Sequence, residues 1–268
     1  MLQNLHTHST FCDGRNTPEE IVLAAIGKKF DSIGFSGHAY TPYDLRYCMK
    51  DTEGYEKEIL RLKEKYGKEI RIFLGTEEDA FAPVQRGRYD YIIGSCHYLF
   101  HEGKYLPIDS SPEHFDRCLE ACGYDLSLLA ERYYGAFCGY IKDRRPDIIG
   151  HFDLITKYDE LGKHSLLADA RYRAIAEKYA LVATKAKCIF EVNTGAISRG
   201  LRTAPYPSEH LLYILKKENA AITLTADSHK AETIDGSFSE VRRYLYDLGF
   251  RSLYMLTSEG FTEAPIRF

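Results

Sequence analysis

The chain has 268 residues, of which 44% are hydrophobic and 28% are charged, so it can bury a substantial core. It has 35 lysine and arginine residues and 39 aspartate and glutamate residues, which gives a net charge of −4, and no segment is rich in basic residues. This balance gives no sign of the cationic surface with which proteins bind long nucleic acids or anionic membranes. We therefore expect that the protein binds neither nucleic acid nor a membrane. A small ligand, attracted by charges close to its binding site, is the expected partner.

The sequence contains neither a recognisable membrane span nor a secretion signal. No apolar stretch approaches the roughly 20 residues that a membrane helix needs, and the opening MLQN lacks the basic-then-apolar order of a signal peptide. The seven cysteines form an odd set without paired C-x-x-C spacing, which argues against a disulfide framework and a structural zinc knuckle. We expect a cytoplasmic protein with free thiols.

Short β-rich segments alternate with segments of helical character, which predicts an α/β fold with a parallel sheet. The first helix has the clearest start, because Thr17 suits the N-cap, Pro18 the first helical position and Glu20 the partner in a capping box. The expected strands are Leu2–Leu5, Ser32–Phe35, Ile70–Leu74, Tyr91–Ile93, Ile148–Ile149, Cys188–Val192, Ile222–Thr225 and Leu253–Leu256. The expected helices are 18–28, Glu53–Tyr66, Pro112–Cys122, Leu126–Asp143, Ala168–Thr184, Ser208–Glu218 and Phe238–Leu248.

One connection is longer than a simple crossover needs. Residues 98–146 contain two of the expected helices, so we interpret them as a helical insertion after the fourth strand. No internal repeat, low-complexity tract or linker divides the chain. Residues 1–268 are therefore predicted to form a single barrel-like domain.

Histidines and carboxylates gather where the predicted strands end. Parallel strands in a β/α barrel deliver their C-terminal ends to one face, where such barrels keep their active sites. A lone strand-end histidine is more often structural than a ligand, but six of the ten histidines of this chain lie at strand ends. The strand-end motifs are His6-Thr7-His8, Gly37-His38, Gly75-Thr76-Glu77, Gly94-Ser95-Cys96-His97, Gly150-His151, Glu191-Val192-Asn193 and Ala226-Asp227-Ser228-His229.

The spacing of these residues favours metal binding. Residues i and i+2 of an extended segment point to the same side, so His6 and His8 can hold one ion, as can Asp227 and His229. Imidazole and carboxylate ligands suit zinc, iron or manganese. Together with Asp13 and Glu77, the strand-end residues supply nine candidate ligands, more than one ion can use. The sequence therefore predicts more than one metal ion.

Six motifs resemble, in order and spacing, those of the polymerase and histidinol phosphatase (PHP) superfamily. They are HTHSTFCDG, FSGHA, GTEED, GSCH, GHFD and TADSH, and they run from His6 to His229. The chain looks most similar to the histidinol-phosphate phosphatase branch. The resemblance implies a distorted, TIM-like barrel of seven β/α units with three bound divalent metal ions, which would be zinc, manganese or iron.

The resemblance also assigns ligands, with Glu77 shared by two of the ions. A water that bridges those two ions would lose its proton near neutral pH and attack phosphorus in line. Asp227, at the edge of the metal site, is the candidate for passing a proton to the leaving alcohol, a role that a metal-bound water could also fill. Some members carry histidine at the position of Asp13, which bears on the metal preference and occupancy of the third site. The implied sets are His6, His8, Asp227 and Glu77 for the first ion, Glu77, His97 and His151 for the second, and Asp13, His38 and His229 for the third.

Charge and position suggest where a phosphate would bind. Three divalent ions carry +6, and three carboxylates with one hydroxide carry −4, which leaves about +2 to meet a monoester dianion. Arg199 and Ser198 follow the sixth strand and could bind the phosphate oxygens, although a solvated loop arginine is an equally good interpretation. Asp79 and Asp153, each two residues past a predicted ligand, could accept hydrogen bonds behind the ligands or bind the cationic amine of histidinol phosphate, but ordinary loop or cap carboxylates are the simpler interpretation.

We therefore predict an enzyme, a metal-dependent phosphomonoesterase that hydrolyses L-histidinol phosphate in histidine biosynthesis, with the substrate resting on the resemblance. One alternative keeps the metal site but cuts phosphodiesters, as a nuclease or a nucleotide phosphoesterase. A second alternative is a non-catalytic metal-binding module. The sequence leaves the oligomeric state open.

Overall fold

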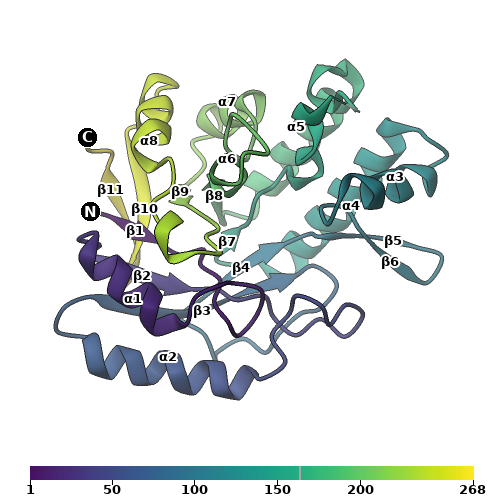
Figure 1. Ribbon diagram of the computed structural model, residues 1–268. Coiled ribbons are helices and arrows are strands. Elements are labelled where there is room, and N and C mark those ends of the chain that lie inside the picture. Colours follow the sequence, from purple (N-terminus) through teal and green to yellow (C-terminus); the bar gives the residue numbers. More distant parts are fainter. Residues whose placement is uncertain (163) are drawn as a thin grey trace.

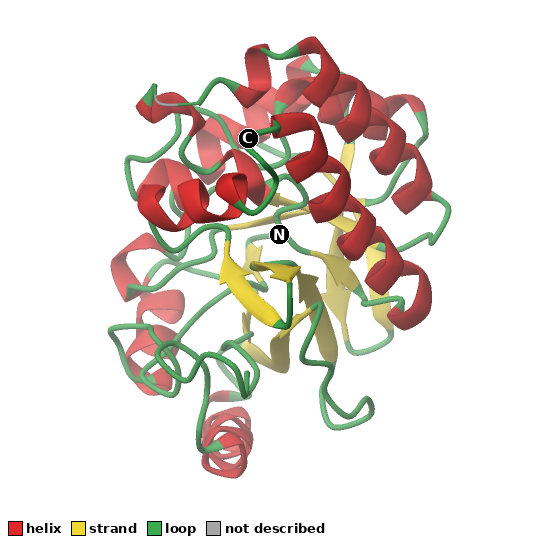
Figure 2. Cartoon of the chain, turned by 90° about the vertical axis from the view of Figure 1, so that its right-hand side faces the viewer, coloured by secondary structure: helices red, strands yellow, loops and turns green. Residues whose placement is uncertain are grey.

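The structure is a computed structural model that describes residues 1–162 and 164–268. Seven parallel strands form one curved sheet in the order β1-β2-β3-β4-β7-β8-β9, with helices on its outer side (Figures 1 and 2). This arrangement confirms the predicted α/β barrel. The strands are β1 Gln3–Asn4, β2 Ser32–Phe35, β3 Arg71–Asp79, β4 Tyr91–Ser95, β7 Ile148–Ile149, β8 Ile189–Asn193 and β9 Ile222–Thr225.

The first and last strands of the sheet meet just beyond their C-terminal ends. There the backbone N–H of His8 donates to the carbonyl of Ser228 at 2.8 Å, and the N–H of Ser228 donates to the carbonyl of His6 at 3.1 Å. The side chain of Asn4 also accepts from the backbone N–H of Ala226 at 3.1 Å. The barrel is therefore nearly closed, and the closure itself holds the two segments that carry the first and last predicted ligands.

Strand β3 is longer than the sequence predicts. The sequence pattern predicts an end at Leu74, so that Glu77 would follow the strand, but β3 continues to Asp79. The reason is a change of partner: residues 71–74 pair with β2, and residues 75–79 pair with β4. Because side chains alternate along a strand, Glu77 and Glu78 point to opposite faces. Glu78 faces outward, where it forms an ion pair at 2.9 Å with Arg144.

The helices match the sequence prediction to within a few residues at most boundaries. At the first helix, Thr17 Oγ1 accepts from the N–H of Glu20, and the Glu20 carboxylate accepts from the N–H of Thr17, which confirms the capping box. No helix in the described ranges is long and apolar enough to span a membrane. The helices are α1 Pro18–Gly27, α2 Thr52–Tyr66, α3 Pro112–Glu120, α4 Leu126–Arg144, α5 Ala170–Thr184, α6 Gly195–Ser198, α7 Glu209–Lys217 and α8 Phe238–Asp247, with short 3-10 turns at Leu154–Thr156, Asp159–Leu161, Leu166–Ala168 and Ala231–Thr233.

The connection between β4 and β7 contains more than the expected helices. It opens with a β-hairpin of β5 (Tyr98–His101) and β6 (Lys104–Pro107), followed by α3 and α4 (Figure 1). The predicted helical insertion after β4 is present, and it begins with a β-hairpin that the sequence pattern does not predict. The hairpin begins directly after His97, and Tyr98 of β5 and Pro107 of β6 line a cavity at this end of the barrel.

The last predicted strand does not join the parallel sheet. Residues Ser252–Thr257 form β10, which pairs antiparallel with β11, Gly260–Pro265. A short turn between the two strands lets the chain fold back at once, whereas a parallel partner would need a long crossover. The hairpin is tied to the barrel through Gln3, whose side chain exchanges two hydrogen bonds of 2.8 and 2.9 Å with the backbone of Leu256.

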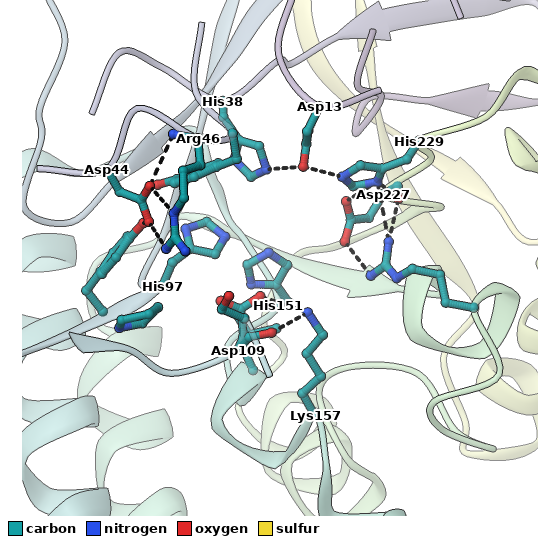
Figure 3. Close-up of a pocket in the computed structure, with 16 residues that line it drawn as sticks. Asp13, His38, Asp44, Arg46, His97, Asp109, His151, Lys157, Asp227 and His229 are labelled. Carbon is teal, nitrogen blue, oxygen red and sulfur yellow. Dashed lines mark hydrogen bonds and ion pairs between the residues drawn. The ribbon is translucent and has the colours of Figure 1, made fainter. Parts of the chain in front are cut away.

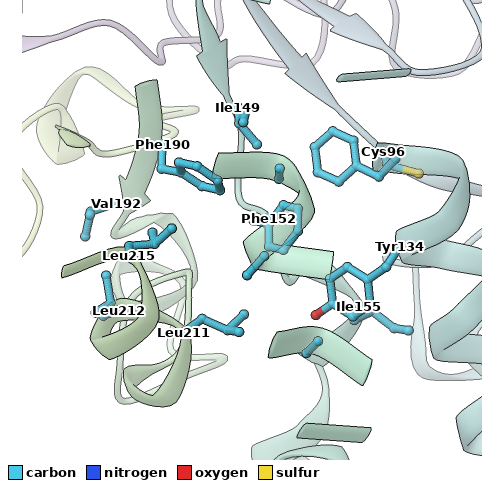
Figure 4. Close-up of a cluster of buried hydrophobic side chains, with 14 of the residues drawn as sticks. Cys96, Tyr134, Ile149, Phe152, Ile155, Phe190, Val192, Leu211, Leu212 and Leu215 are labelled. Carbon is cyan, nitrogen blue, oxygen red and sulfur yellow. The ribbon is translucent and has the colours of Figure 1, made fainter. Parts of the chain in front are cut away.

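The largest hydrophobic core lies between the sheet and the helices α4, α5 and α7 (Figure 4). Phe190 and Val192 of β8 point outward into it, and Leu212 of α7 packs there as well, all three with no exposed surface. Buried apolar surface of this kind supplies most of the free energy of folding. This core therefore fixes the strands whose ends carry the candidate ligands.

Adjacent leucines on α4 provide a matched test of this packing. Leu129 is fully buried in the core, whereas Leu128 is 40% exposed. We expect Leu129→Ala to lower the free energy of unfolding by about 2–5 kcal/mol, because it leaves a cavity. Leu128→Ala should lower it by less than about 1 kcal/mol. Urea denaturation measures both values, and equal losses would contradict the packing described.

Candidate metal centre

One face of the barrel brings together all nine residues that the sequence predicts as metal ligands. Figure 3 shows six of them, Asp13, His38, His97, His151, Asp227 and His229, around the cavity that opens there. Their ligand atoms form four groups, and within each group all atoms lie within 4.8 Å of one another. Three members of the implied first set, His6, His8 and Asp227, form one of these groups, without Glu77. The third set forms another group that His8 joins, and the second set is divided between two groups that share Glu77. The groups are His6, His8 and Asp227; His6, Glu77 and His151; His38, Glu77 and His97; and His8, Asp13, His38 and His229.

Glu77 occupies the centre of this arrangement, with only 1% of its surface exposed. Its Oε1 lies 3.3 Å from Nε2 of His97 and 3.1 Å from Nε2 of His151. Its Oε2 lies 3.2 Å from Nε2 of His6 and 2.9 Å from Nδ1 of His38. Each oxygen thus faces a different pair of imidazoles, which is the geometry of a carboxylate that bridges two cations.

Several buried polar atoms at this point have no hydrogen-bond partner among the described residues. They are both carboxylate oxygens of Glu77 and the Nε2 atoms of His6 and His8. Leaving such an atom buried and unpaired costs about 1–3 kcal/mol, so several of them converging on one place call for a ligand. Neutral imidazole and carboxylate lone pairs are the donors that zinc, manganese and iron accept. The residues present therefore fit divalent metal ions.

The group around Asp13 lies nearer to the solvent. The Asp13 side chain is 33% exposed, and its Oδ2 lies 3.3 Å from Nε2 of His229 and 3.8 Å from Nε2 of His38. The ring of His8 stacks on that of His229 with centroids 4.1 Å apart. His8 therefore stands between this outer group and the buried centre at Glu77.

Asp227 contacts both a candidate ligand, His8, and the guanidinium of Arg199. Its Oδ1 lies 3.2 Å from Nε2 of His8, and its Oδ2 accepts from the guanidinium of Arg199 at 3.1 Å. The backbone of Asp227 is left-handed, with φ of 45°, a conformation that costs energy for a residue with a side chain and persists only where the surroundings impose it. The next residue, Ser228, forms a parallel β-bridge with Thr7 and so helps to hold the backbone of Asp227 in this conformation.

Burial and neighbouring charges set the protonation of the centre. Burial raises the pKa of Glu77, but the imidazoles of His6 and His38 outweigh this effect and hold the pKa well below its usual value. Burial, together with the neighbouring His229 and His38, lowers the pKa of His8 to about 3. Glu77 is therefore an anion at neutral pH, and His8 offers a neutral lone pair, the states in which both bind metals.

A cavity of about 350 Å³ opens over these ligands. Asp109 and Lys157 line it as an ion pair at 2.9 Å, and Asp44 and Arg46 line it as another at 2.6 Å (Figure 3). None of these four residues is predicted from the sequence, because they lie on irregular loops that carry no strand or helix pattern. Asp109 lies two residues beyond β6, a strand that the sequence pattern does not predict, so no local signal identifies it.

The two predicted substrate-binding residues differ in placement. Arg199 lines the cavity with a side chain that is 33% exposed. Ser198 is not among the lining residues, and its Oγ instead packs against Gly236, in the space that a Cβ at that position would need. A role for the Ser198 hydroxyl in binding a ligand stays a prediction.

Two further carboxylates have structural partners. Asp79 Oδ2 lies 3.2 Å from Nδ1 of His97, so it supports a predicted ligand from behind. Asp153 accepts from the backbone N–H of Ser208 at 2.9 Å and from its hydroxyl. Asp153 therefore anchors the segment before α7 rather than the cavity.

Known proteins resemble the chain over most of its length. It is 28% identical over 274 residues to a probable histidinol-phosphatase from Schizosaccharomyces pombe, covering 94% of this chain and 88% of that protein. It is 24% identical over 251 residues to the histidinol-phosphatase of Bacillus subtilis, covering 84% of this chain and 92% of that protein. The similarity therefore extends well beyond the ligand motifs.

Solved structures share the fold. A candidate histidinol phosphatase from Listeria monocytogenes superposes with a TM-score of 0.76 at 22% identity, covering 89% of this chain and 99% of the other. A histidinol phosphate phosphatase from Lactococcus lactis, solved with zinc, L-histidinol and phosphate, superposes with a TM-score of 0.71 at 20% identity, covering 97% of this chain and 98% of the other. At these identities the superpositions establish the fold.

The family model for the PHP domain matches residues 4–195, which is more than half of the chain. The match includes the strand ends that carry His6, Glu77 and His151. These three side chains form one of the ligand groups of the structure. The chain belongs to the PHP domain family.

Proposed function

We propose that this protein is a metal-dependent phosphomonoesterase that hydrolyses L-histidinol phosphate to L-histidinol and phosphate in histidine biosynthesis. The observation that carries the proposal is the Glu77 carboxylate, whose two oxygens face separate imidazole pairs below an open cavity. The names of the relatives support the substrate, and the Lactococcus lactis structure contains zinc and both products of this reaction.

The centre is proposed to hold three divalent ions, which would be zinc, manganese or iron. The ligand groups and their unpaired buried atoms support this assignment. Glu77 would be shared between two of the ions, and Asp13 would serve the third. The proposed sets are His6, His8, Asp227 and Glu77; Glu77, His97 and His151; and Asp13, His38 and His229.

When bound, such ions would activate a water for in-line attack and neutralise the charge of the phosphoryl group. The residues of the chain have their own parts. Arg199 would bind a phosphate oxygen, since its guanidinium lines the cavity and already donates to Asp227, one of the proposed ligands. Asp227, between this cation and the inner histidines, is the candidate for passing a proton to the leaving alcohol.

The cavity favours a small substrate. Its volume of about 350 Å³ is at the lower end of the range for small-molecule sites. Its wall contains Asp44 and Asp109 as well as the cations that pair with them. A phosphate at Arg199 and a cationic amine or imidazole at the acidic positions would meet complementary charges, whereas a nucleic-acid backbone would find acidic groups along its path.

A substrate panel tests the function. Metal-reconstituted protein is offered histidinol phosphate, sugar phosphates, nucleoside bisphosphates and single-stranded DNA, and the release of phosphate or nucleotide is measured. We expect the highest kcat/KM for histidinol phosphate. A preference for the diester would favour the phosphodiesterase alternative, and no turnover with zinc, manganese or iron would favour a metal-binding module.

Glu77→Gln tests the centre itself. The amide keeps the size of the side chain but removes the charge that two ions would share, so we expect kcat/KM to fall at least about 100-fold. Glu78→Gln is the matched control, because Glu78 is also buried but faces Arg144 on the outer side. It should lower the melting temperature and leave turnover within about twofold of the wild-type value. Full activity in Glu77→Gln would refute the placement of Glu77.

A further inference from the structure

Another buried glutamate, Glu191 of β8, lies behind the ligands and belongs to none of the ligand groups. Its Oε1 lies 2.5 Å from Nδ1 of His6 and accepts from the hydroxyl of Thr225 at 2.7 Å. Its Oε2 accepts from the backbone N–H of His151 at 2.6 Å and from the side-chain amide of Asn193 at 3.0 Å. One carboxylate thus receives four donors.

These four donors come from different parts of the barrel. His6 follows β1 and His151 follows β7, whereas Thr225 ends β9 and Asn193 ends β8. Two of the four donors belong to predicted metal ligands. Glu191 therefore connects the first ligand of the chain with one that lies 145 positions later, independently of Glu77, because residues 6 and 151 both donate to it.

The contact with His6 fixes how that imidazole faces the centre. An ionised carboxylate only accepts hydrogen bonds, so Nδ1 of His6 must carry the proton. In the neutral ring this leaves the lone pair on Nε2, the atom that lies 3.2 Å from Glu77 Oε2 and 3.7 Å from Asp227 Oδ1. Carboxylates behind ligating histidines commonly set the tautomer and the ring orientation in this way.

His151 is held differently. Its Nε2 faces Glu77, but its Nδ1 has no hydrogen-bond partner among the described residues. Its position depends instead on the backbone, where the N–H donates to Glu191 and the preceding Gly150 donates to the carbonyl of Gly94 at 2.8 Å. Glu191 thus orients one ligand through its ring and another through its main chain.

We propose that Glu191 is a positioning residue of the metal centre, which holds His6 in the metal-binding tautomer and His151 at the correct distance from Glu77. The inference rests on the proposed function, because it presupposes that the centre binds divalent ions. It assigns no contact between Glu191 and an ion or a substrate.

The hydrogen-bond pattern makes glutamine at position 191 a sharp test. The two donors at Oε2 cannot reverse, because the N–H of His151 only donates and the amide oxygen of Asn193 already accepts from the backbone of α6. The amide oxygen of the glutamine must therefore take the place of Oε2, which turns its NH₂ group toward His6 and Thr225. The Thr225 hydroxyl can rotate to accept. His6 can accept only by moving its proton to Nε2, which removes the lone pair from the metal.

The experiment measures zinc affinity by competition with a chelator, without substrate, together with the melting temperature of the metal-free protein. We expect Glu191→Gln to weaken zinc binding about 10–100-fold, although the packing and the number of hydrogen bonds at position 191 are kept. Glu78→Gln, the control at a buried carboxylate outside the centre, should change the melting temperature but not the affinity. If Glu191→Gln yields no folded protein, Glu191→Asp replaces it, because the shorter side chain draws the acceptor away from His6, and the same weakening is expected.

The outcomes separate the two proposals. Zinc affinity within twofold of wild type in a folded variant would overturn the role of Glu191, whatever the enzyme turns over. Wild-type protein that binds zinc but does not hydrolyse histidinol phosphate would overturn the proposed function. The zinc affinity of the variants would then still decide the role of Glu191. Wild-type protein that binds no divalent ion would overturn both.

Discussion

The structure depends on a buried carboxylate placed among imidazoles. Glu77 is almost fully excluded from solvent, and an ionised group in that position is stable only if positive charge or hydrogen bonds surround it. The barrel provides this surrounding because its parallel strands all end on one face. The change of partner along β3 is the local cause, since the strand carries Glu77 past the end of β2 to the point where the histidines converge.

The same constraint accounts for the further carboxylates that lie behind the candidate ligands. Asp79 backs His97, and Glu191 backs His6, so that each of these histidines has one nitrogen occupied and the other directed at Glu77. Ligands that are oriented before an ion arrives lose little conformational freedom when it binds. The outer group at Asp13 has more contact with solvent, since the Asp13 side chain is 33% exposed.

Regular patterns in the sequence predict the barrel and the histidines and carboxylates that gather on one of its faces. The alternation of strands and helices indicates the fold, and the i, i+2 spacing of His6 with His8 and of Asp227 with His229 identifies residues that the structure brings together. Prediction is wrong where pairing depends on distant partners. Neither the continuation of β3 nor the antiparallel pairing of β10 can be read from local composition. Each depends on which neighbouring strand the segment pairs with in the folded chain, β4 for β3 and β11 for β10. Residues on irregular loops, such as Asp109, and a carboxylate inside a strand, such as Glu191, carry no local signature of their role.

The most direct test of the metal centre is a crystal structure of metal-loaded protein, with ions located by anomalous scattering. We expect two peaks within coordination distance of Glu77, one on each carboxylate oxygen, and a third beside Asp13. A map without ions between Glu77 and its histidines, or one in which the carboxylate turns away from His6 and His151, would contradict the central claim that these strand ends build a metal centre.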